Sequence, residues 1–553
     1  MLKSLLLFSL LFSSSAFAAL SAATTWEVQS LSTAANANGC GFVTGATGTD
    51  WSQATSAKYT GTDLLSSTGT TAPCTVSTTS SHSFIATDVG NLIHITAGTS
   101  WLPAWYQIVS VAAGVATLDR ACGSVASISS GTYSIGGACS LNSSTANQTD
   151  TNWAAAVIAG NTVYIKNDAA YTFAAAPTFG AGSSGTVKVK IIGYNSSRGD
   201  NPTLSNRPSI NAGTFTVNFG GFTQVSNLIV TGTASPVFKF AAWGFGNNLK
   251  CTNTSTTASR ACINFSDDGG SLYNSESVSY RGTAVSTQSS NQFASHNIFY
   301  NYLHDSNIGL AAGAEGVSVV GNLIASNVTD AITVASSSDS NYFIAQNTLY
   351  GLESKKGVGI AISSEPNNLS IINNIVYGFV TGISDAGGAN AFNFGDYNDF
   401  NNNTTNFSTW TDGAHSITTS PAFTNVAQYT GTTATTTGSV LTDSGANYTD
   451  IVAGRDYLYV SATTGGTVGI YGITTSTSTT ITTDIALGSG TAVTYFVTHG
   501  RNWTVGTNVK AVGFPGLFNG LSATQGYTDI GAVQRQDPGG AGSGYSRGRV
   551  INR

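Results

Sequence analysis

The sequence contains few charged residues. Lys and Arg number 21 and Asp and Glu number 27 among 553 residues, so charged residues make up 9% of the chain, against roughly 25% in an average globular protein. The net charge is -6 at pH 7, and the basic residues form no block. Because a protein that binds nucleic acid normally presents a cationic surface, we expect no nucleic-acid partner.

Long apolar runs are also missing. The N-terminus reads MLKSLLLFSLLFSSSAFAA, in which one lysine precedes an apolar run and the triplet Ala16-Phe17-Ala18. This pattern predicts a secretory signal peptide over residues 1–18. No other stretch reaches the ~20 apolar residues that a membrane span needs. We therefore expect a secreted or cell-surface protein that has no membrane span.

Methionine is nearly absent, and cysteine is sparse. Met1 is the single methionine, and there are six cysteines: Cys40, Cys74, Cys122, Cys139, Cys251 and Cys262. An even number of cysteines behind an export signal predicts disulfides. Sequence proximity suggests the pairs Cys251–Cys262 and Cys122–Cys139, although the sequence leaves the connectivity open. The cysteine spacing matches no zinc motif, so we predict no metal centre from these residues.

Hydrophobic residues make up 41% of the chain and aromatic residues 10%, a composition that, together with many turn-forming residues, is typical of a β-rich protein. An asparagine recurs ahead of short β-prone runs, at Asn227, Asn248, Asn274, Asn297, Asn322, Asn347, Asn374 and Asn398. The intervals are 21, 26, 23, 25, 25, 27 and 24 residues. Such a period predicts a parallel β-solenoid with one coil per repeat.

The repeat resembles the right-handed parallel β-helix proteins of the pectin lyase-like superfamily, of bacterial and phage type. The resemblance covers residues 146–425, with a closing segment at 501–534, and implies an all-β fold of about 24–25 residues per coil. Residues 151–160 resemble the helix that caps the first coil, and residues 161–166 then begin a strand. The segments 420–423 and 528–534 resemble two segments that often end such chains.

Two further segments resemble each other. Residues 81–119 and 446–484 have the same order of strand-like runs and turns, which predicts two small accessory β-modules. We place them at 19–145, ahead of the β-helix, and at 426–500, inserted before its closing segment. Residues 535–553 are rich in Gly and Arg and read as a flexible tail.

The repeated asparagines predict a stacked structural column. Equivalent residues of successive parallel coils lie about 4.8 Å apart, so Asn297, Asn322, Asn347 and Asn374 are expected to stack. Asparagine tolerates a left-handed turn, and its amide bonds to the backbone or to the next amide. These residues therefore need no functional explanation.

A second column is predicted from charged residues. Asp305 and Asp330 follow their asparagines at the same offset, with Arg281 and Lys355 on either side and His304 adjacent. Two carboxylates about 5 Å apart repel each other, and three explanations stay open. The column is charge-balanced and structural, or the pair is a catalytic or substrate site with His304 as acid or base, or it binds Ca²⁺.

The catalytic motifs of the resembled enzymes are largely missing. Asp267-Asp268-Gly resembles the paired aspartates of polygalacturonases, but their Gly-His-Gly and Arg-Ile-Lys motifs and the arginine motif of pectate lyases are absent. We therefore interpret Asp267 and Asp268 as turn residues and lean towards a protein that is not an enzyme.

The leading hypothesis is an exported or virion-displayed β-helix protein, adhesin-like or tailspike-like, that recognises an extended glycan. Aromatic rings at coil edges suit sugar faces, and the candidates are Tyr273, Tyr280, Tyr300, Tyr302, Tyr342, Tyr350 and Tyr377. One alternative is a polysaccharide lyase or glycoside hydrolase, and another is a structural surface or filament component. An oligomer is compatible with each, and Ca²⁺ is the one cofactor considered.

Overall fold

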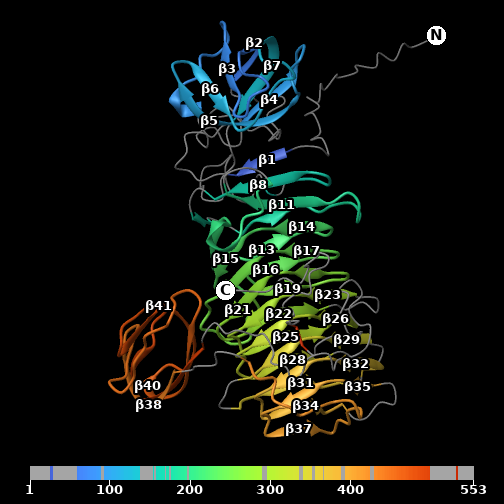
Figure 1. The fold of residues 1–553 in the computed structure, drawn as a ribbon, viewed down its shortest axis with the longest axis vertical. Coiled ribbons are helices and arrows are strands. Elements are labelled where there is room, and N and C mark those ends of the chain that lie inside the picture. The colour runs from blue at the N-terminus through green and yellow to red at the C-terminus, as the bar shows by residue number, and fades with distance from the viewer. Residues whose placement is uncertain are drawn as a thin grey trace, which may run out of the picture.

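The structure is a computed structural model that describes residues 25–28, 59–88, 92–136, 154, 157–167, 170–173, 176–195, 199–288, 295–335, 341–351, 355–364, 366–387, 393–423, 429–498 and 531–532. They form a long stack of parallel strands, with one small barrel at its N-terminal end and a second at its side (Figure 1). The predicted signal peptide and the tail at 535–553 lie outside the described residues.

Three parallel sheets run along the solenoid, and each coil adds one strand to each sheet. Sheet 1 comprises β1 (Thr25–Val28), β8 (Thr162–Lys166), β11 (Val189–Tyr194), β14 (Thr223–Ser226), β17 (Phe245–Asn247), β20 (Ser271–Tyr273), β23 (His296–Phe299), β26 (Gly316–Val320), β29 (Asn341–Ala345), β32 (Asn368–Ile372) and β35 (Phe394–Asp396). Sheet 2 comprises β9 (Tyr171–Thr172), β12 (Ser209–Gly213), β15 (Ile229–Gly232), β18 (Lys250–Asn253), β21 (Glu276–Ser279), β24 (Tyr302–His304), β27 (Leu323–Ala325), β30 (Thr348–Tyr350), β33 (Ile375–Tyr377) and β36 (Asp399–Asn401).

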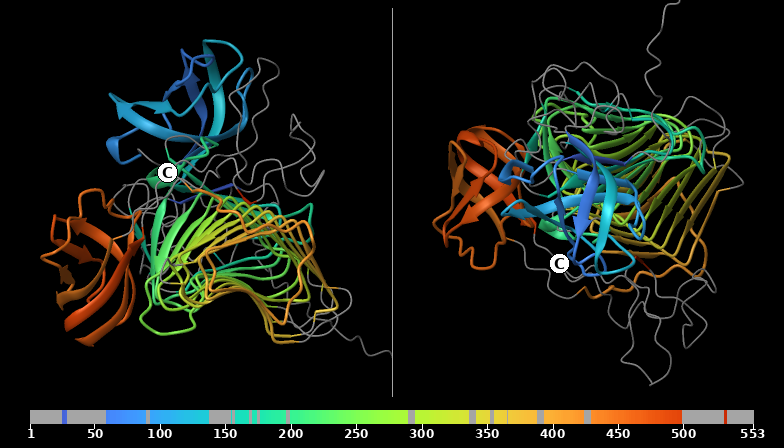
Figure 2. Two further views of the ribbon diagram at one scale, coloured as in Figure 1. Left: turned by 60° about the horizontal axis from the view of Figure 1, so that its bottom comes forward. Right: turned by 90° about the horizontal axis from the view of Figure 1, so that it is seen from above.

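Sheet 3 closes each coil. It comprises β10 (Thr178–Phe179), β13 (Val217–Phe219), β16 (Phe238–Phe240), β19 (Ile263–Phe265), β22 (Thr283–Gln288), β25 (Ile308–Gly313), β28 (Asp330–Val334), β31 (Val358–Ile362), β34 (Thr381–Asp385) and β37 (Thr405–Ser408). The view along the axis shows the three sheets surrounding one interior (Figure 2). The predicted parallel β-helix is confirmed.

The interior is filled by alternate side chains of every strand. In sheet 3, Phe179, Phe219, Phe240 and Phe265 are buried, with centroid distances of 5.5, 5.0 and 5.0 Å between successive rings. Equivalent residues stack because the strands pair in register, so the phenylalanine of one coil lies directly beside that of the next. Because successive side chains of a strand point to opposite faces, buried apolar residues alternate with outward residues along these strands.

Both accessory modules are closed six-stranded antiparallel barrels. The first contains β2 (Tyr59–Ser66), β3 (Thr75–Thr78), β4 (Leu92–Ala97), β5 (Ala104–Ala112), β6 (Val115–Leu118) and β7 (Ile128–Gly136). The second contains β38 (Tyr429–Thr437), β39 (Val440–Thr442), β40 (Tyr457–Gly466), β41 (Gly469–Ser476), β42 (Thr480–Thr483) and β43 (Gly488–Thr498). Their strand orders match one for one, β2-β3-β6-β5-β4-β7 and β38-β39-β42-β41-β40-β43. The similarity predicted between the two segments is thus a shared topology.

The described disulfides are Cys251–Cys262 and Cys74–Cys122. The first pair was predicted from proximity. The suggested Cys122–Cys139 pair is wrong, because Cys122 is bonded to Cys74, which directly precedes β3. Cys40 and Cys139 lie outside the described residues.

Helix is scarce in the described residues. Two short 3-10 turns occur at Ala86–Asp88 and Leu204–Asn206. Of the predicted capping helix at 151–160, Ala154 is helical, residues 157–160 are not, and the others lie outside the described residues. No helix in the described part of the chain is long and apolar enough to span a membrane. From the predicted closing segment, Gly531 donates a hydrogen bond to the Asn373 carbonyl over 3.0 Å and so returns to the corner before sheet 2.

Candidate functional site

The second barrel covers the predicted acid–base residues His304 and Asp305. Both side chains are buried on β24 and the corner that follows it. Asp305 Oδ1 accepts a hydrogen bond from Thr498 Oγ1 of β43 over 2.8 Å, and the His304 ring meets the edge of Tyr457 of β40 at a centroid distance of 5.4 Å. This site is therefore an interface between solenoid and barrel rather than an open cleft.

Three further contacts hold the barrel. Tyr280 Oη donates to Asp484 Oδ2 over 2.6 Å, and Arg281 Nη2 donates to Tyr471 Oη over 3.1 Å. Lys356 Nζ lies 3.4 Å from Tyr459 Oη. Around these polar contacts an apolar cluster forms, comprising Val278, Tyr280, Tyr457, Tyr459 and Ile470. Arg281, which was predicted to neutralise a carboxylate pair, contacts the barrel instead.

The predicted Asp305–Asp330 pair does not form. Asp305 lies in the corner before sheet 3, where its backbone nitrogen bonds to the Ala325 carbonyl. Asp330 is the first residue of β28 and pairs with Ile308 and Val358, so it occupies a different column. Burial raises the pKa of Asp330, and its carboxylate accepts a hydrogen bond from Thr333 over 3.3 Å. Lys355 lies in the corner before β31 with a left-handed φ of 52°.

The predicted asparagine column is real but shifted. Asn301, Asn322, Asn347, Asn374 and Asn398 form an asparagine ladder, in which each Oδ1 accepts from the backbone nitrogen of the preceding asparagine over 2.9 Å. Asn301 replaces Asn297 in this ladder. Asn297 lies four residues earlier on β23, facing outward, where its amide lies 3.3 Å from Ser271 Oγ.

The predicted tyrosines divide by environment. Tyr342 is buried in the solenoid core and donates to the Ala314 carbonyl over 2.6 Å, and Tyr350 is buried against Tyr377 at a centroid distance of 5.1 Å. Tyr302 is stacked on His304 at 3.7 Å, and Tyr280 is buried at the barrel. Tyr273, on the outer side of sheet 1, and Tyr300, at the corner that follows β23, remain as surface candidates.

These two tyrosines belong to a larger aromatic face, which we define as Phe222, Trp243, Phe245, Tyr273, Phe299 and Tyr300. Gly246, Leu272 and Ile298 are buried and pair in register across β17, β20 and β23. Their neighbours Phe245, Tyr273 and Phe299 therefore point outward and are half-buried. Tyr273 lies 5.3 Å from each of the other two rings. Tyr300, at the following corner, is 42% exposed. The face therefore spans successive coils along the solenoid axis.

Trp243 and Phe222 extend the aromatic face at the corner between sheets 3 and 1. Their rings are nearly parallel, with 6° between the planes and 6.3 Å between centroids. Trp243 is 49% exposed, and its ring lies against Gly269, where φ is +70° and a Cβ would come within 2.2 Å of the ring. Asp267 and Asp268 belong to the turn that leads to Gly269, as predicted for turn residues.

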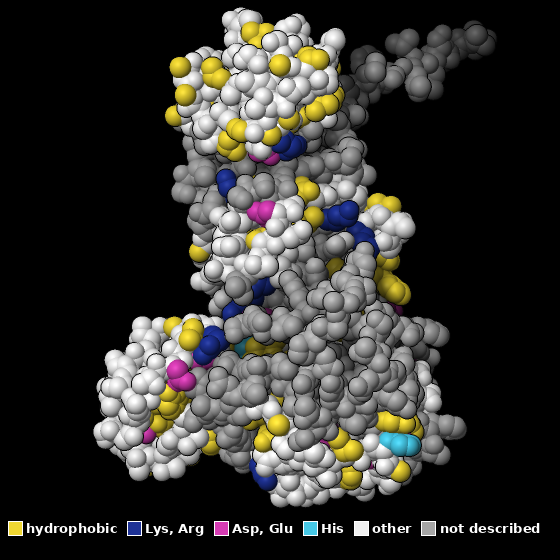
Figure 3. All heavy atoms as spheres, viewed as in Figure 1, with side chains coloured by type: hydrophobic (Ala, Val, Ile, Leu, Met, Phe, Trp, Pro, Cys, Tyr) yellow, Lys and Arg dark blue, Asp and Glu magenta, His cyan; other side chains and the backbone are white. Residues whose placement is uncertain are grey.

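Polar groups on this part of sheet 1 are mostly neutral. Asn274 Nδ2 donates to Asn247 Oδ1 over 3.1 Å, and Lys188 Nζ lies 5.8 Å from the centroid of the Phe245 ring. The surface visible in Figure 3 carries scattered charges among many uncharged polar groups. Aromatic rings interspersed with amides and hydroxyls are the groups that contact a sugar ring through its face and its hydroxyls.

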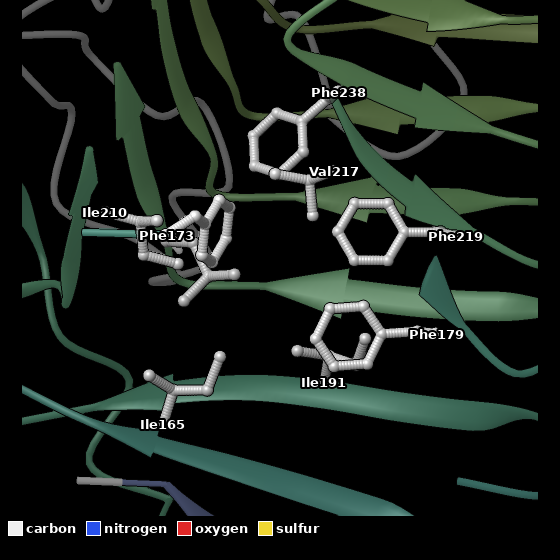
Figure 4. A pocket seen from close by; sticks show the side chains of 9 residues that line it. Ile165, Phe173, Phe179, Ile191, Ile210, Val217, Phe219 and Phe238 are labelled. Carbon is white, nitrogen blue, oxygen red and sulfur yellow. The ribbon is translucent and has the colours of Figure 1, made fainter. Parts of the chain in front are cut away.

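An apolar cavity lies inside the first coils. Its lining includes Ile165, Phe173, Phe179, Ile191, Ile210, Val217, Phe219 and Phe238, whose side chains converge from the three sheets (Figure 4). Since no polar group lines it, the cavity offers nothing to orient a glycan or to transfer a proton. Among the described residues, no group of three or more His, Cys, Asp and Glu side chains could hold a metal ion. The Ca²⁺ hypothesis loses the carboxylate pair on which it was based and stays a prediction.

No protein-family model matches the chain, and no curated protein matches it. Solved structures with a similar chain path include the A-module of an Azotobacter vinelandii mannuronan C-5 epimerase, at 13% identity and a TM-score of 0.26, covering 46% of this chain and 88% of that one. The Dettilon tailspike protein has 13% identity and a TM-score of 0.25, covering 63% and 85%. The tailspike of Acinetobacter baumannii bacteriophage AP22, solved with capsular saccharide, has 11% identity and a TM-score of 0.16, covering 80% and 84%.

Sequence reasoning missed most of the aromatic face. Trp243 and Phe245 alternate with buried Gly244 and Gly246, and Phe299 follows buried Ile298. This period-two pattern was the available signal. Glu276, Lys250 and Thr498, which complete the buried site around His304, carried no such signal. They come from strands far apart in the sequence, and one of them comes from the inserted barrel.

Proposed function

We propose that this protein is an exported β-helix protein that binds an extended glycan through the aromatic face. The observation that supports the proposal is the run of outward rings on consecutive strands β17, β20 and β23, continued by exposed Tyr300 and Trp243. Rings repeated in successive coils fit a ligand that runs along the solenoid axis. The two disulfides suit an exported protein.

The rigidity of the fold favours this function. The aromatic side chains project from strands that pair in register on both sides, so the rings are held before a ligand arrives and little ordering entropy is lost on binding. A glycan contacts such a surface by stacking on the rings and by hydrogen bonds to Asn247, Asn274 and Ser271.

Binding to a panel of neutral and acidic polysaccharides, measured by affinity electrophoresis and calorimetry, tests the proposal. Trp243→Ala and Tyr273→Ala should each weaken binding about fivefold or more, the effect of losing at least ~1 kcal/mol from a buried aromatic contact. Phe394→Ala is the matched control, because Phe394 is 47% exposed on the same sheet but lies outside the aromatic face. Equal binding by all three variants and the wild type would refute the proposal.

The enzymatic alternative is checked on the same samples. A lyase would release unsaturated products, and a hydrolase would release reducing ends. If either activity is found, Asp305 and Asp330, which stand in different columns, stay the predicted catalytic residues to be tested. Binding without cleavage supports the proposed function.

A further inference from the structure

His304 stands between two carboxylates in the interface with the second barrel. Its Nδ1 lies 2.7 Å from Asp305 Oδ2, and its Nε2 lies 3.2 Å from Glu276 Oε1. The exposed fractions of the His304, Glu276 and Asp305 side chains are 1, 4 and 5%. We propose that Glu276, His304 and Asp305 form a proton-dependent latch that seats the second barrel on the solenoid.

The latch depends on protonation because of the donors that its geometry requires. A neutral imidazole has one N–H and one lone pair, whereas an imidazolium has two N–H donors. With carboxylate oxygens at both nitrogens, the imidazolium satisfies both contacts. The neutral ring would turn its lone pair towards one of the carboxylate oxygens, which repels it.

Charge balance gives the same direction. Lys250 Nζ lies 3.2 Å from Glu276 Oε1, so two cations face two carboxylates when His304 is protonated. Loss of the proton removes a positive charge from between two buried carboxylates, and taking a counter-charge away from buried carboxylates is unfavourable. The contact between the second barrel and the solenoid is therefore strongest at mildly acidic pH and weakens as the pH rises.

Residues of the barrel complete the latch. Thr498 Oγ1 of β43 donates to Asp305 Oδ1 over 2.8 Å, and the Tyr457 ring of β40 lies in a T-shaped contact with the His304 ring. On the solenoid side Tyr302 stacks on the His304 ring. Among neighbouring titratable groups, Tyr280 packs against Tyr457, and Arg455 is paired with Asp456 and interacts with Tyr302.

Comparison of the two barrels identifies a contact with the solenoid that is specific to the second barrel. Tyr106 and Tyr471 occupy equivalent places, since Ile93↔Tyr106 and Leu458↔Tyr471 are equivalent pairings and each hydroxyl bonds to the carbonyl four residues earlier. Over Tyr106 lies Arg120 from the same barrel, whereas over Tyr471 lies Arg281 from the solenoid. In the first barrel the cation over the tyrosine ring thus belongs to the barrel itself, whereas in the second barrel it belongs to the solenoid.

Hydroxyl-radical footprinting of the full chain tests the latch. Tyr457 and Tyr459 report on the interface, and core Tyr342 reports on folding of the solenoid. In the wild type, modification of the two interface tyrosines should rise at least about fivefold between about pH 5.5 and pH 8.5 if loss of the imidazolium proton releases the barrel, while Tyr342 stays protected. In His304→Gln the interface tyrosines should be modified readily at both pH values.

His415→Gln is the control, because His415 also pairs with a carboxylate, Asp396 Oδ2 at 2.7 Å, but is 62% exposed and lies outside the interface. This variant should keep the wild-type pH response. Protection that does not change with pH in the wild type, or a response that survives in His304→Gln, overturns the proposal. If Tyr342 shows that His304→Gln is unfolded, ¹⁵N NMR of the wild-type ring decides: a neutral His304 in the seated state also overturns it.

Discussion

Tyr280 of the solenoid donates a hydrogen bond to Asp484 of the second barrel over 2.6 Å, and 204 residues separate the two in sequence. Burial raises the pKa of the Tyr280 hydroxyl and also that of the Asp484 carboxyl. Asp484 follows β42 and also accepts a hydrogen bond from the Gly472 backbone nitrogen. The contact therefore joins two parts of the chain whose proximity no local pattern indicates.

Tyr280→Phe should weaken the seating of the second barrel. The partly buried Asp484 carboxylate would lose a donor while the ring packing stayed, and a hydrogen bond to a charged group contributes about 1–3 kcal/mol. Urea unfolding followed by footprinting of Tyr457 measures the loss. Tyr300→Phe, at an exposed corner, should leave the unfolding curve unchanged. A Tyr280→Phe protein as resistant to urea as the wild type would contradict this account.

Asn347→Ala should strongly destabilise the solenoid. Asn347 Oδ1 accepts from the backbone nitrogen of Asn322, and its Nδ2 donates to the Val319 carbonyl and to Asn374 Oδ1, all within buried surroundings. Alanine removes these three hydrogen bonds and leaves the buried backbone nitrogen of Asn322 without its ladder acceptor, at a total cost of roughly 2–5 kcal/mol. Asn368→Ala is the matched control.

The control removes a similar bond from the surface. Asn368 Nδ2 donates to Asn341 Oδ1 over 2.9 Å at an exposed position, so its loss should change the free energy of unfolding by no more than about 0.5 kcal/mol. Chemical denaturation of both variants under one condition gives the comparison. Equal effects would mean that burial does not set the value of the asparagine ladder.

The fold could be predicted from the sequence because every coil of the solenoid repeats the same short pattern of turn and strand residues. The asparagine period predicted the solenoid, and the similarity of segments 81–119 and 446–484 predicted two like modules. The period was also the source of the error at Asn297. Successive members of the asparagine ladder are separated by 21, 25, 27 and 24 residues, so counting a constant 25 from Asn322 gives Asn297 instead of Asn301.

The same variation explains the missing carboxylate pair. A fixed offset of eight residues reached Asp305 from Asn297 but Asp330 from Asn322, and these asparagines occupy different columns. The contacts of the inserted barrel lay beyond any periodic argument, because a module inserted between coils can dock on any face. The sequence singled out His304 and Asp305, but it gave no sign of their contacts with β40 and β43.

Asp399→Asn should stabilise the protein at neutral and alkaline pH. Asp399 is fully buried on β36 and neither of its carboxyl oxygens has a hydrogen-bond partner among the described residues, so burial raises its pKa to about 8. Because the folded state binds the proton more tightly, stability falls as pH rises from about 4 towards 8, by about 1.4 kcal/mol per unit of the pKa difference.

Thermal unfolding at several pH values measures this effect. The Asn variant should gain several kcal/mol over the wild type near pH 8 and little near pH 4, where the carboxyl is protonated in both states. Asp267→Asn, in a turn at the surface of the solenoid, should show no comparable gain. A variant that is less stable than the wild type at pH 8 would indicate that the carboxylate has a stabilising partner.

His296 should make the solenoid sensitive to acid. It is buried on β23, its Nδ1 accepts a hydrogen bond from the Gly270 backbone nitrogen over 3.1 Å, and burial lowers its pKa to about 4. The unfolded chain binds the proton more tightly, so stability is complete above about pH 6.5 and falls as the pH drops towards 4. A difference of about 2.5 in pKa between the folded and unfolded states corresponds to roughly 3 kcal/mol in the free energy of unfolding.

Denaturant unfolding between about pH 4 and pH 7 tests this, with His296→Gln as the variant. Glutamine keeps an acceptor for Gly270 without a titrating group, so its stability should change less over this range than that of the wild type, by up to roughly 3 kcal/mol. His415→Gln, which removes an exposed histidine, should keep the acid sensitivity. Burial disfavours the charged form of a histidine, so removing His296 should remove the acid sensitivity that it causes. The same loss of stability in wild type and His296→Gln would therefore mean that another group causes it.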